Sequence, residues 1–441
     1  MKITVIGAGQ GGLYAAALLA KGGADVTVYE KCAEDTLGID WFDGVEIKLF
    51  TDLGLEVPSD SFKGFPASFI GPLSDKLLYL WCPADKADWS VNRRSFSKQL
   101  VGLAKQSGAK FVFETAVDSL IINKTAVKGV RVAGEDTFCD LVIDSSGVFS
   151  PFRASLPKRA HITAQPDTDD IFNVYRGIYS QTPDYPELPA NEKFKMYLKY
   201  LGKKSISWCG VEPSGELNVL TGMIGEMSAD EQAELFTSLK ADNPIIGEVK
   251  DGRSAFASIP VRAPLSMFCT DGYAAIGDAA FMTIPVMGNG IANSIRAGKI
   301  LAETVLDSGS ASLEALWTYQ VKYYKQIGAV CFMLDFCKRG LLATNNAEMR
   351  AFMESGAVTD DDIKAVMSGS LPRHSPAEWA KKVGHFIASR AFIGGVAKYA
   401  LKGVKTMLKA NAIPTEYDIR KVEKWQTELE DLMKKPIIIQ N

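Results

Sequence analysis

The sequence is poor in histidine and lacks long apolar runs. Its three histidines, His161, His374 and His385, do not have the spacing of metal ligands, so we expect no histidine-based metal centre. The seven cysteines form no C-x-x-C pair, which favours reduced thiols over a disulfide framework or a zinc site. No run of about 18 apolar residues occurs, so no membrane-spanning helix is expected.

The numbers of basic and acidic residues are also nearly equal, 49 against 52. The net charge of −3 gives no overall reason to expect a nucleic-acid partner. An apolar strand pattern begins at residue 2, which leaves no room for a signal peptide, so the expected location is the cytoplasm. A length of 441 residues with 47% hydrophobic residues favours two or three domains with ample core.

The most informative stretch opens the chain. Residues 1–31 indicate a buried strand, a glycine turn (GAGQGG), a small-residue helix and a second strand. The G-x-G-x-x-G spacing serves a tight turn, close approach of a pyrophosphate and helix–strand packing, and Glu30 ends the second strand where a carboxylate accepts a hydrogen bond from a ribose 2′-hydroxyl. The pattern favours FAD or NAD over NADP. The predicted dinucleotide site comprises Gly7, Gly9, Gly11, Gly12, Glu30 and Lys31.

Three stretches together resemble the FAD-dependent enzymes of the p-hydroxybenzoate hydroxylase fold. They are GAGQGG with Glu30, Arg93 with Phe96 and Leu100, and GDAAFMTIPVMGNGIANSIRAGKILAE at 277–303. Within that group the chain looks most like the geranylgeranyl reductase family, which saturates isoprenoid double bonds on lipids or pigments. The resemblance covers the first 150 residues and residues 272–303.

The resemblance implies an α/β fold with a Rossmann-like FAD-binding domain. We expect that domain over residues 1–150 and 272–306, where GYAAIGDAA again indicates a buried strand running into a helix. An inserted antiparallel-sheet substrate domain is expected over 151–271, since ISWCGVE and ELNVLTGMI indicate paired strands across the turn PSGE. A helical C-terminal region is expected over 307–441.

The resemblance also implies contacts along the whole of FAD. Asp278 would bind the ribityl chain, Arg93 the phosphates, and the backbone of Val117 the adenine. Pro285 and the run Gly288, Asn289 and Gly290 would pass beside the isoalloxazine ring. The helix that begins near Ile291 would stabilise negative charge on its pyrimidine side. Trp208 and Pro213 match a substrate-cavity motif of the reductases, in which the aromatic residue expected before the proline is Glu212 here. Val117 and Trp208 are equally compatible with plain core positions.

Two departures concern catalysis. Related enzymes carry Asp-Gly, which helps to hold FAD and present NAD(P)H, where this chain has Ser146-Gly147, so the electron donor is NAD(P)H or another reductant. The reductases also tend to have Cys-Gly in the loop after Glu30, whereas this loop is LGIDWFDGVEI. No catalytic residue is assigned. The candidates for a proton donor, Asp40, Tyr79, Trp81 and Cys82, rest on their place in aromatic segments alone.

Three functions remain open at this point. The leading hypothesis is an FAD-dependent reductase that transfers hydride from reduced flavin to a double bond of an apolar, isoprenoid or lipid-like substrate. The alternative is an FAD-dependent monooxygenase that hydroxylates an aromatic or apolar small molecule through the same FAD residues. The third is a lipid-binding homologue without catalysis.

Residues 376–414 combine an apolar stripe with many cations. A basic amphipathic helix is typical of contact with a membrane surface, here the inner face, but a helix with a solvated lysine face fits the pattern equally well. The cations are Lys381, Lys382, Arg390, Lys398, Lys402, Lys405 and Lys409.

Overall fold

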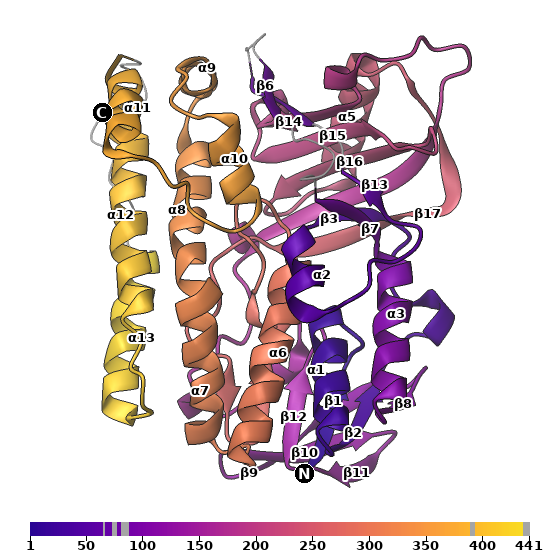
Figure 1. Ribbon diagram of the computed structural model, residues 1–441, viewed down its shortest axis with the longest axis vertical. Coiled ribbons are helices and arrows are strands. Elements are labelled where there is room, and N and C mark those ends of the chain that lie inside the picture. Colours follow the sequence, from indigo (N-terminus) through magenta and orange to yellow (C-terminus); the bar gives the residue numbers. More distant parts are fainter. Residues whose placement is uncertain (65–66, 73–76, 81–87, 389–392, 435–441) are drawn as a thin grey trace.

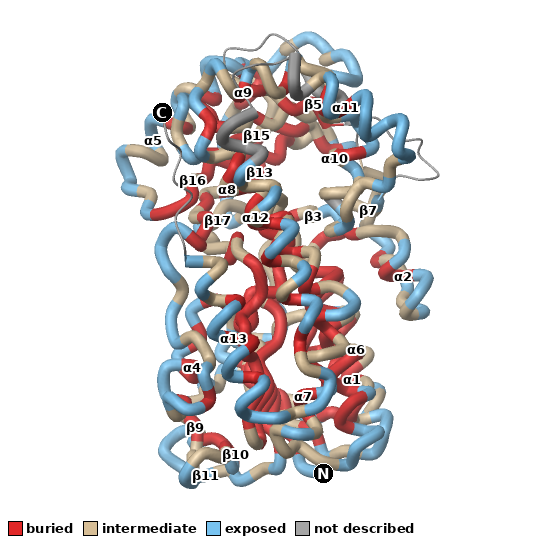
Figure 2. Tube along the Cα trace, turned by 90° about the vertical axis from the view of Figure 1, so that its left-hand side faces the viewer, coloured by how far each residue is buried: buried red, intermediate tan, exposed pale blue. Residues whose placement is uncertain are grey.

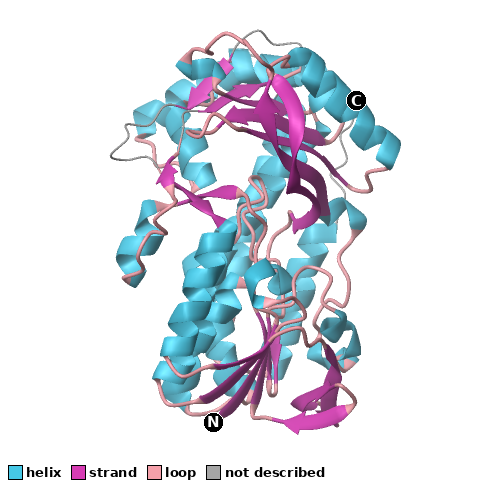
Figure 3. Cartoon of the chain, turned by 90° about the vertical axis from the view of Figure 1, so that its right-hand side faces the viewer, coloured by secondary structure: helices cyan, strands magenta, loops and turns pink. Residues whose placement is uncertain are grey.

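The computed structural model describes residues 1–64, 67–72, 77–80, 88–388 and 393–434. The molecule is elongated, with one sheet near each end of its long axis (Figures 1 and 3). Helices run along this axis beside the lower sheet and continue to the upper one. Figure 2 shows that buried residues concentrate in the strands of the lower sheet and in the helices against it.

The lower sheet has six strands in the order β18-β19-β12-β1-β2-β8. All neighbours are parallel except β18 and β19. Helices α1 (Gln10–Lys21), α3 (Arg93–Gln106) and α6 (Ile291–Ser308) lie together beside it. The strands are β1 (Lys2–Ile6), β2 (Asp25–Tyr29), β8 (Lys110–Val112), β12 (Leu141–Asp144), β18 (Cys269–Thr270) and β19 (Tyr273–Ala275). Their branched apolar side chains suit strands that are covered on both faces.

Two small sheets flank this core. An antiparallel meander of β9 (Val117–Asn123), β10 (Ala126–Val132) and β11 (Glu135–Phe138) lies at the lower end of the molecule. Between the large sheets, β7 (Trp89–Asn92) pairs with β3 (Phe42–Val45) and β4 (Phe62–Lys63), and α2 (Ile47–Leu53) follows β3. The short helix α4 (Pro151–Ser155) begins the crossing to the upper sheet.

The upper sheet has seven strands in the order β17-β13-β16-β15-β14-β5-β6. The expected pair across the turn PSGE is confirmed, because β15 (Ser205–Val211) and β16 (Leu217–Ile224) are antiparallel neighbours. The other strands are β17 (Ile246–Pro260), β13 (Ile171–Gln181), β14 (Phe194–Leu198), β5 (Ala67–Ile70) and β6 (Leu77–Leu80). Residues 67–70 and 77–80, assigned from the sequence to the first domain, therefore pair with this sheet: β5 meets the free edge of β14, and β6 pairs with β5.

Alternation along the upper strands separates two faces. Tyr197, Cys209 and Val219 point to one face, where they pack with Leu235 and Leu239 of α5 (Ala229–Asp242). The residues between them point to the opposite face, toward the lower domain.

The C-terminal region is helical. It contains α7 (Leu313–Tyr323), α8 (Ala329–Ala343), α9 (Asn346–Glu354), α10 (Asp360–Met367), α11 (Pro376–Ala388), α12 (Ile393–Asn411) and α13 (Ile419–Lys434). Helix α12 packs along α8, and α10 reaches the edge strand β6. Within the described ranges, no helix combines the length and apolar character needed to cross a membrane.

A buried ionic cluster fixes α8 to the crossover that leaves the upper sheet. Asp335 is fully buried and pairs with Lys338 (3.0 Å) and Arg339 (2.9 Å), and Arg339 also reaches Asp170 (3.2 Å). Burial alone would raise the pKa of Asp335, but the charges of Lys338 and Arg339 lower it to about 2. The cluster thus joins the helical region to the segment that enters β13 of the upper sheet. The predicted fold class, a Rossmann-like domain with an antiparallel sheet and C-terminal helices, is confirmed.

Candidate functional site

The glycine turn holds the end of β1 close to the end of β12. Gly7 has φ +84°, and its N–H donates to Tyr29 O at 2.8 Å. A Cβ at Gly9 would lie 2.4 Å from Ser145 Oγ, and one at Gly12 would lie 2.6 Å from the same atom. Side chains at these positions would therefore separate α1 from the lower sheet.

Gly11 serves a different contact. A Cβ there would lie 2.5 Å from the backbone oxygen of Ser294 in α6, and a Cβ at Gly298 would lie 2.4 Å from Gly11 O. Helices α1 and α6 thus touch backbone to backbone, which brings their N-termini side by side. Two neighbouring helix N-termini offer unpaired N–H groups and positive dipole ends to anionic groups.

Glu30 closes the turn from the β2 side. Its carboxylate accepts hydrogen bonds from Ala8 N (2.6 Å) and Cys32 N (2.9 Å), and the residue is buried. The side chain thus fixes the backbone of the glycine turn and still forms part of a cavity wall.

A cavity of about 830 Å³, the central cavity, lies between the lower domain and the upper sheet. Its size falls within the range of cofactor and small-molecule sites. Eleven of the residues predicted from the sequence line it: Gly9, Gly11, Glu30, Lys31, Arg93, Trp208, Asp278, Gly288, Asn289, Gly290 and Ile291. The other five predicted residues are not among those that line the cavity. Gly7 and Gly12 face Ser145, Val117 begins β9, and Pro213 and Pro285 are each next in sequence to a lining residue.

The far wall of the central cavity is apolar. It is formed by the inner face of the upper sheet, where every second residue of each strand points the same way. Its members are Phe69, Phe172, Val174, Phe194, Met196, Leu198, Ile206, Trp208, Leu220, Ala257 and Ile259. This wall suits a long hydrocarbon better than a small polar molecule.

Asp278 lies on the opposite wall, in the short turn Gly277–Ala280 that follows β19. Burial raises the pKa of its carboxyl above the ordinary value, while the hydrogen bond from Thr283 Oγ1 (3.0 Å) and the charge of Arg93 act in the other direction. Oδ1 takes that hydrogen bond. Within the described part of the chain Oδ2 has no donor, so it is available to a hydroxyl group.

Residues 284–290 form a tight loop in front of α6. Ile284 N donates to Asn289 O at 2.9 Å, and Gly288 has φ +69°. A Cβ at Gly290 would lie 2.8 Å from Thr283 Oγ1, so glycine is required by the approach to the Asp278 turn. The Asn289 side chain ties the loop to Gly44 O of β3 at 2.8 Å.

Arg176 anchors a polar group within the apolar wall. It is buried and donates to Asp43 Oδ1 (2.6 Å) and Asn218 Oδ1 (2.9 Å), with the rings of Trp41 and Trp208 at 5.0 and 5.4 Å from its guanidinium carbon. Burial alone would raise the pKa of Asp43, but the charges of Arg176 and Arg93 hold it below the ordinary value. The ion pair links the upper sheet to β3.

The cavity walls meet the demands of a bound nucleotide cofactor. Gly9 and Gly11 contribute backbone to the cavity wall, since their Cβ positions face Ser145 and Ser294, and Asp278 offers an acceptor. The indole N–H of Trp41, a buried lining residue, has no acceptor among the described residues, so an oxygen of a bound molecule would satisfy it.

Sequence reasoning missed several lining residues. Trp41, Asp43 and Arg176 carry no motif, and tertiary contacts alone bring them together. Ser146, in place of the expected aspartate, turns inward and donates to Asp144 Oδ1 at 2.6 Å. Glu212 lies in the Trp208 segment that the sequence singles out, but the sequence predicts no role for it.

Of the four proton-donor candidates, only the Asp40 side chain can be compared with the cavity lining. Asp40 pairs with Arg253 at 3.0 Å and is absent from the lining of the central cavity. Tyr79 lies in β6, and Trp81 and Cys82 fall outside the described residues.

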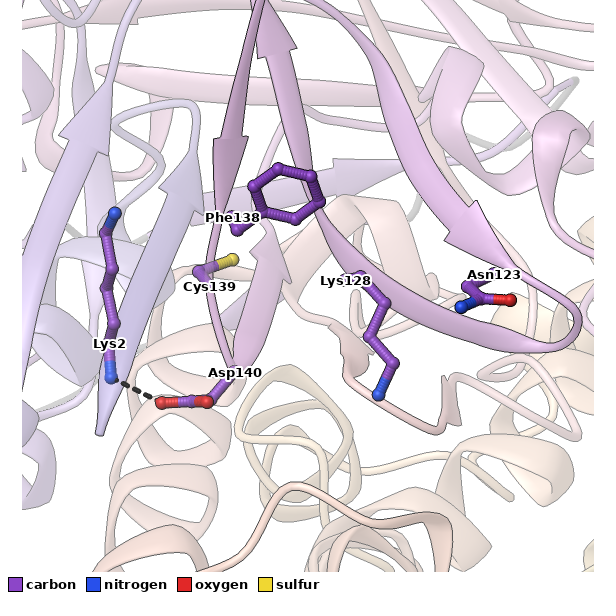
Figure 4. A pocket seen from close by; sticks show the side chains of 6 residues that line it. All are labelled: Lys2, Asn123, Lys128, Phe138, Cys139 and Asp140. Atoms are coloured by element: carbon purple, nitrogen blue, oxygen red, sulfur yellow. Dashed lines mark hydrogen bonds between the residues drawn. The ribbon is translucent and has the colours of Figure 1, made fainter.

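A smaller cavity of about 350 Å³ lies at the lower end of the molecule (Figure 4). Lys2, from β1, and the meander residue Phe138 contribute to it, and Lys2 N donates to Asp140 Oδ2 at 2.7 Å. None of the residues predicted from the sequence lines it, so the central cavity is the candidate site.

We expect Gly11→Ala to destabilise the fold. The new Cβ would meet backbone of α6 that cannot move aside, which costs about 1 to 3 kcal/mol in the free energy of unfolding. Denaturant unfolding measures this. Gly102→Ala in α3 is the control, because no atom lies within 4 Å of its Cβ position and alanine favours a helix. Equal stabilities for the two variants would contradict the tight α1–α6 contact.

Comparisons with known proteins agree with this geometry. Residues 5–67 match the family model of the NAD(P)-binding Rossmann-like domain. The digeranylgeranylglycerophospholipid reductase of Methanothrix thermoacetophila is 27% identical over 74% of this chain and 83% of the relative. The corresponding Methanosarcina acetivorans reductase is 25% identical over 74% of this chain and 80% of its own length.

Solved structures show the same fold. The geranylgeranyl bacteriochlorophyll reductase-like protein of Thermoplasma acidophilum has a TM-score of 0.73 and 18% identity, covering 90% of this chain and 98% of its own. A probable FAD-dependent monooxygenase of Pseudomonas aeruginosa has a TM-score of 0.59 and 18% identity, covering 80% of this chain and 99% of its own. These similarities confirm the resemblance predicted from the sequence: the chain is similar to the geranylgeranyl reductases and has the fold of flavin-dependent oxidoreductases.

Proposed function

We propose that the chain is an FAD-dependent reductase that saturates carbon–carbon double bonds of an isoprenoid lipid. The observation that carries the proposal is the two-sided central cavity, with a nucleotide cradle on one wall and the apolar face of the upper sheet on the other. The names of the relatives, which are reductases of geranylgeranylated phospholipids, support the same substrate class.

In this proposal the cofactor extends from the glycine turn to the loop before α6. The N-terminus of α1 and Gly9 would take the pyrophosphate, and Glu30 the adenosine ribose. Asp278 would accept from the ribityl hydroxyls, and the N-terminus of α6 would face the pyrimidine side of the ring. Arg93 opens onto the same cavity beside Asp43, at 3.5 Å, as a cation for the phosphates.

A reduced flavin supplies hydride when bound. The protein orients the alkene and excludes water from it. The apolar wall desolvates an isoprenoid chain at roughly 25 cal/mol per Å² of apolar surface removed from water. Arg176, with its partners Asp43 and Asn218, forms a polar zone within this apolar wall.

The function test uses the purified, flavin-loaded protein. We expect the reduced enzyme, under anaerobic conditions, to saturate a geranylgeranylated glycerophospholipid, measured as a mass increase of two hydrogens per double bond. Dithionite, NADH and NADPH are compared as reductants, because Ser146 replaces the expected aspartate. Oxygen-dependent hydroxylation of the substrate, without saturation, would support the monooxygenase instead.

Asp278→Ala should lower flavin retention. The variant removes the acceptor for the ribityl hydroxyls, so we expect the dissociation constant for flavin to rise at least tenfold, measured by titration of the apoprotein. Asp307→Ala, at an exposed position of α6, is the control. A variant that binds flavin as tightly as wild type would remove Asp278 from the site.

We further propose that α11 and α12 contact an anionic membrane surface to obtain this lipid. Each helix leaves large apolar side chains in solvent, with Trp379 and Val383 49% exposed on α11 and Leu401 and Leu408 72% and 59% exposed on α12. Lys398 and Lys405 are exposed within one helical turn of Leu401, and Lys381 is exposed on α11. An apolar strip flanked by lysines fits insertion into the headgroup region.

Several of the cations expected from the sequence have interaction partners within the protein. Lys382 is buried and pairs with Asp362, Lys409 pairs with Glu428, and Lys402 lies over the Phe336 ring at 5.0 Å. Arg390 lies outside the described residues.

Charge reversal tests the membrane surface. The triple variant Lys381→Glu, Lys398→Glu and Lys405→Glu should reduce cosedimentation with phosphatidylglycerol vesicles by tenfold or more, since each lysine contributes about 1 kcal/mol near such a surface. The control reverses Lys21, Lys124 and Lys240, which are exposed elsewhere, and changes net charge equally. If both triple variants lose vesicle binding equally, net charge and not this surface drives the binding.

A further inference from the structure

Glu212 is a buried carboxyl group on the wall of the central cavity, 6% exposed, at the end of β15. A tight turn fixes its backbone, since its N–H donates to Glu216 O and its carbonyl accepts from Gly215 N, both at 2.8 Å. Its Oε1 accepts from Asn218 Nδ2 at 3.2 Å. The side chain is thus held in place by a neutral amide.

The charges around Glu212 are already balanced by other groups. Arg176 pairs with Asp43 at 2.6 Å. Arg253 pairs with Glu216 at 2.6 Å and with Asp40 at 3.0 Å, and Glu216 also meets Lys250 at 3.1 Å. Among the residues that the structure describes, Glu212 enters no ion pair, so it is not needed as a counter-ion.

Burial shifts the titration of Glu212 toward its neutral, protonated form. It raises the pKa of the carboxyl above the ordinary value, and this outweighs the opposite effects of the Asn218 hydrogen bond and the charges of Arg176 and Arg253. A raised pKa is the direction of shift that general acid catalysis requires of a carboxyl group.

Hydrogen bonds connect Glu212 to the loop in front of α6. Asn218 Oδ1 accepts from Arg176 Nε at 2.9 Å and from Trp208 Nε1 at 3.1 Å. Arg176 continues to Asp43, and the next residue, Gly44, accepts from Asn289 at 2.8 Å. Glu212 and this loop thus belong to the same rigid network around one cavity.

The other carboxyls that line the central cavity have other partners. Glu30 accepts two backbone N–H groups, and Asp43 is paired with Arg176. Asp278 accepts from Thr283 in the flavin half of the site, and Asp88 is exposed to solvent. Glu212 is therefore the lining carboxyl best placed to act as an acid in the apolar half.

We infer that Glu212 donates the proton that completes reduction of the substrate double bond. The inference rests on the proposed function. Saturation adds a hydride and a proton: the hydride, from a reduced flavin, brings its electron pair to one alkene carbon. The π electrons form the second C–H bond with the proton of Glu212, whose O–H electron pair stays on the carboxylate. Water then reprotonates the carboxylate.

The test compares wild type, Glu212→Gln and Glu212→Asp in single-turnover reduction of a geranylgeranylated glycerophospholipid by the reduced holoenzyme. We expect Glu212→Gln to lower the rate constant at least 100-fold, as loss of a general acid does by about 10²–10⁴. Flavin content and lipid affinity should stay within twofold of wild type, and Glu212→Asp should restore part of the rate. Glu234→Gln, on α5 behind the sheet, is the matched control.

Two further readouts separate an acid from a structural residue. The wild-type rate constant should fall as pH rises through the pKa of Glu212, and Glu212→Gln should lose this dependence. Infrared titration of the oxidised holoenzyme should show a carboxylic-acid band that is absent from Glu212→Gln. The midpoint of this band should lie above the ordinary glutamate value of about 4.3.

The outcomes are distinguishable. If wild type saturates the lipid and Glu212→Gln does so at the same rate and pH dependence, the assignment fails while the proposed function stands. A carboxylic-acid band that titrates at the ordinary glutamate pKa would also overturn the assignment of Glu212. If flavin-loaded wild type saturates no double bond, the proposed function fails and the assignment with it. Should Glu212→Gln not fold, Glu212→Asp and the wild-type pH profile decide.

Discussion

The structure depends on close backbone contact around Ser145. Two glycines of the turn after β1, Gly9 and Gly12, press against this serine at the end of β12, and Gly11 touches the backbone of α6. These contacts bring the ends of two parallel strands and the starts of two helices to one point. Positive helix ends and unpaired N–H groups then converge at the edge of the central cavity, where they would stabilise an anionic cofactor.

The second constraint is the burial of charge between the sheets. Arg176 is surrounded by apolar wall residues, and Asp43 and Asn218 accept hydrogen bonds from its N–H groups. A buried pair of this kind contributes little net stability, since desolvation offsets the attraction, but it fixes the relative position of the parts it joins. Here it joins the upper sheet to β3, and thereby the substrate wall to the cofactor loop.

Two residues that depart from the family pattern, Ser146 and Glu212, form specific hydrogen bonds in the structure. Ser146 donates to the buried carboxylate of Asp144, which also accepts from Ser150 and Tyr273, so the site of the missing aspartate is filled by an internal network. Glu212 stands where the resemblance predicts an aromatic residue, and it lines the central cavity. A substitution that weakens the sequence match thus introduces the chemical group on which the proposed proton transfer depends.

The sequence by itself determined the local parts of this protein. The G-x-G-x-x-G spacing, Glu30 and the run from Asp278 to Ile291 act through short-range geometry, because each turn and helix start is fixed by residues close in the chain. The strand pair across PSGE was predictable for the same reason. The resemblance to the geranylgeranyl reductases followed from these local motifs.

Tertiary structure alone decided what lies opposite them. Residues 67–70 and 77–80 join the upper sheet because β14 offers a free edge, which no local pattern records. Arg176 meets Asp43, 133 positions away, and the exposed side of α12 depends on which residues pack against α8. Sequence patterns report neighbours along the chain, whereas the apolar wall and its acid arise from contacts between distant segments.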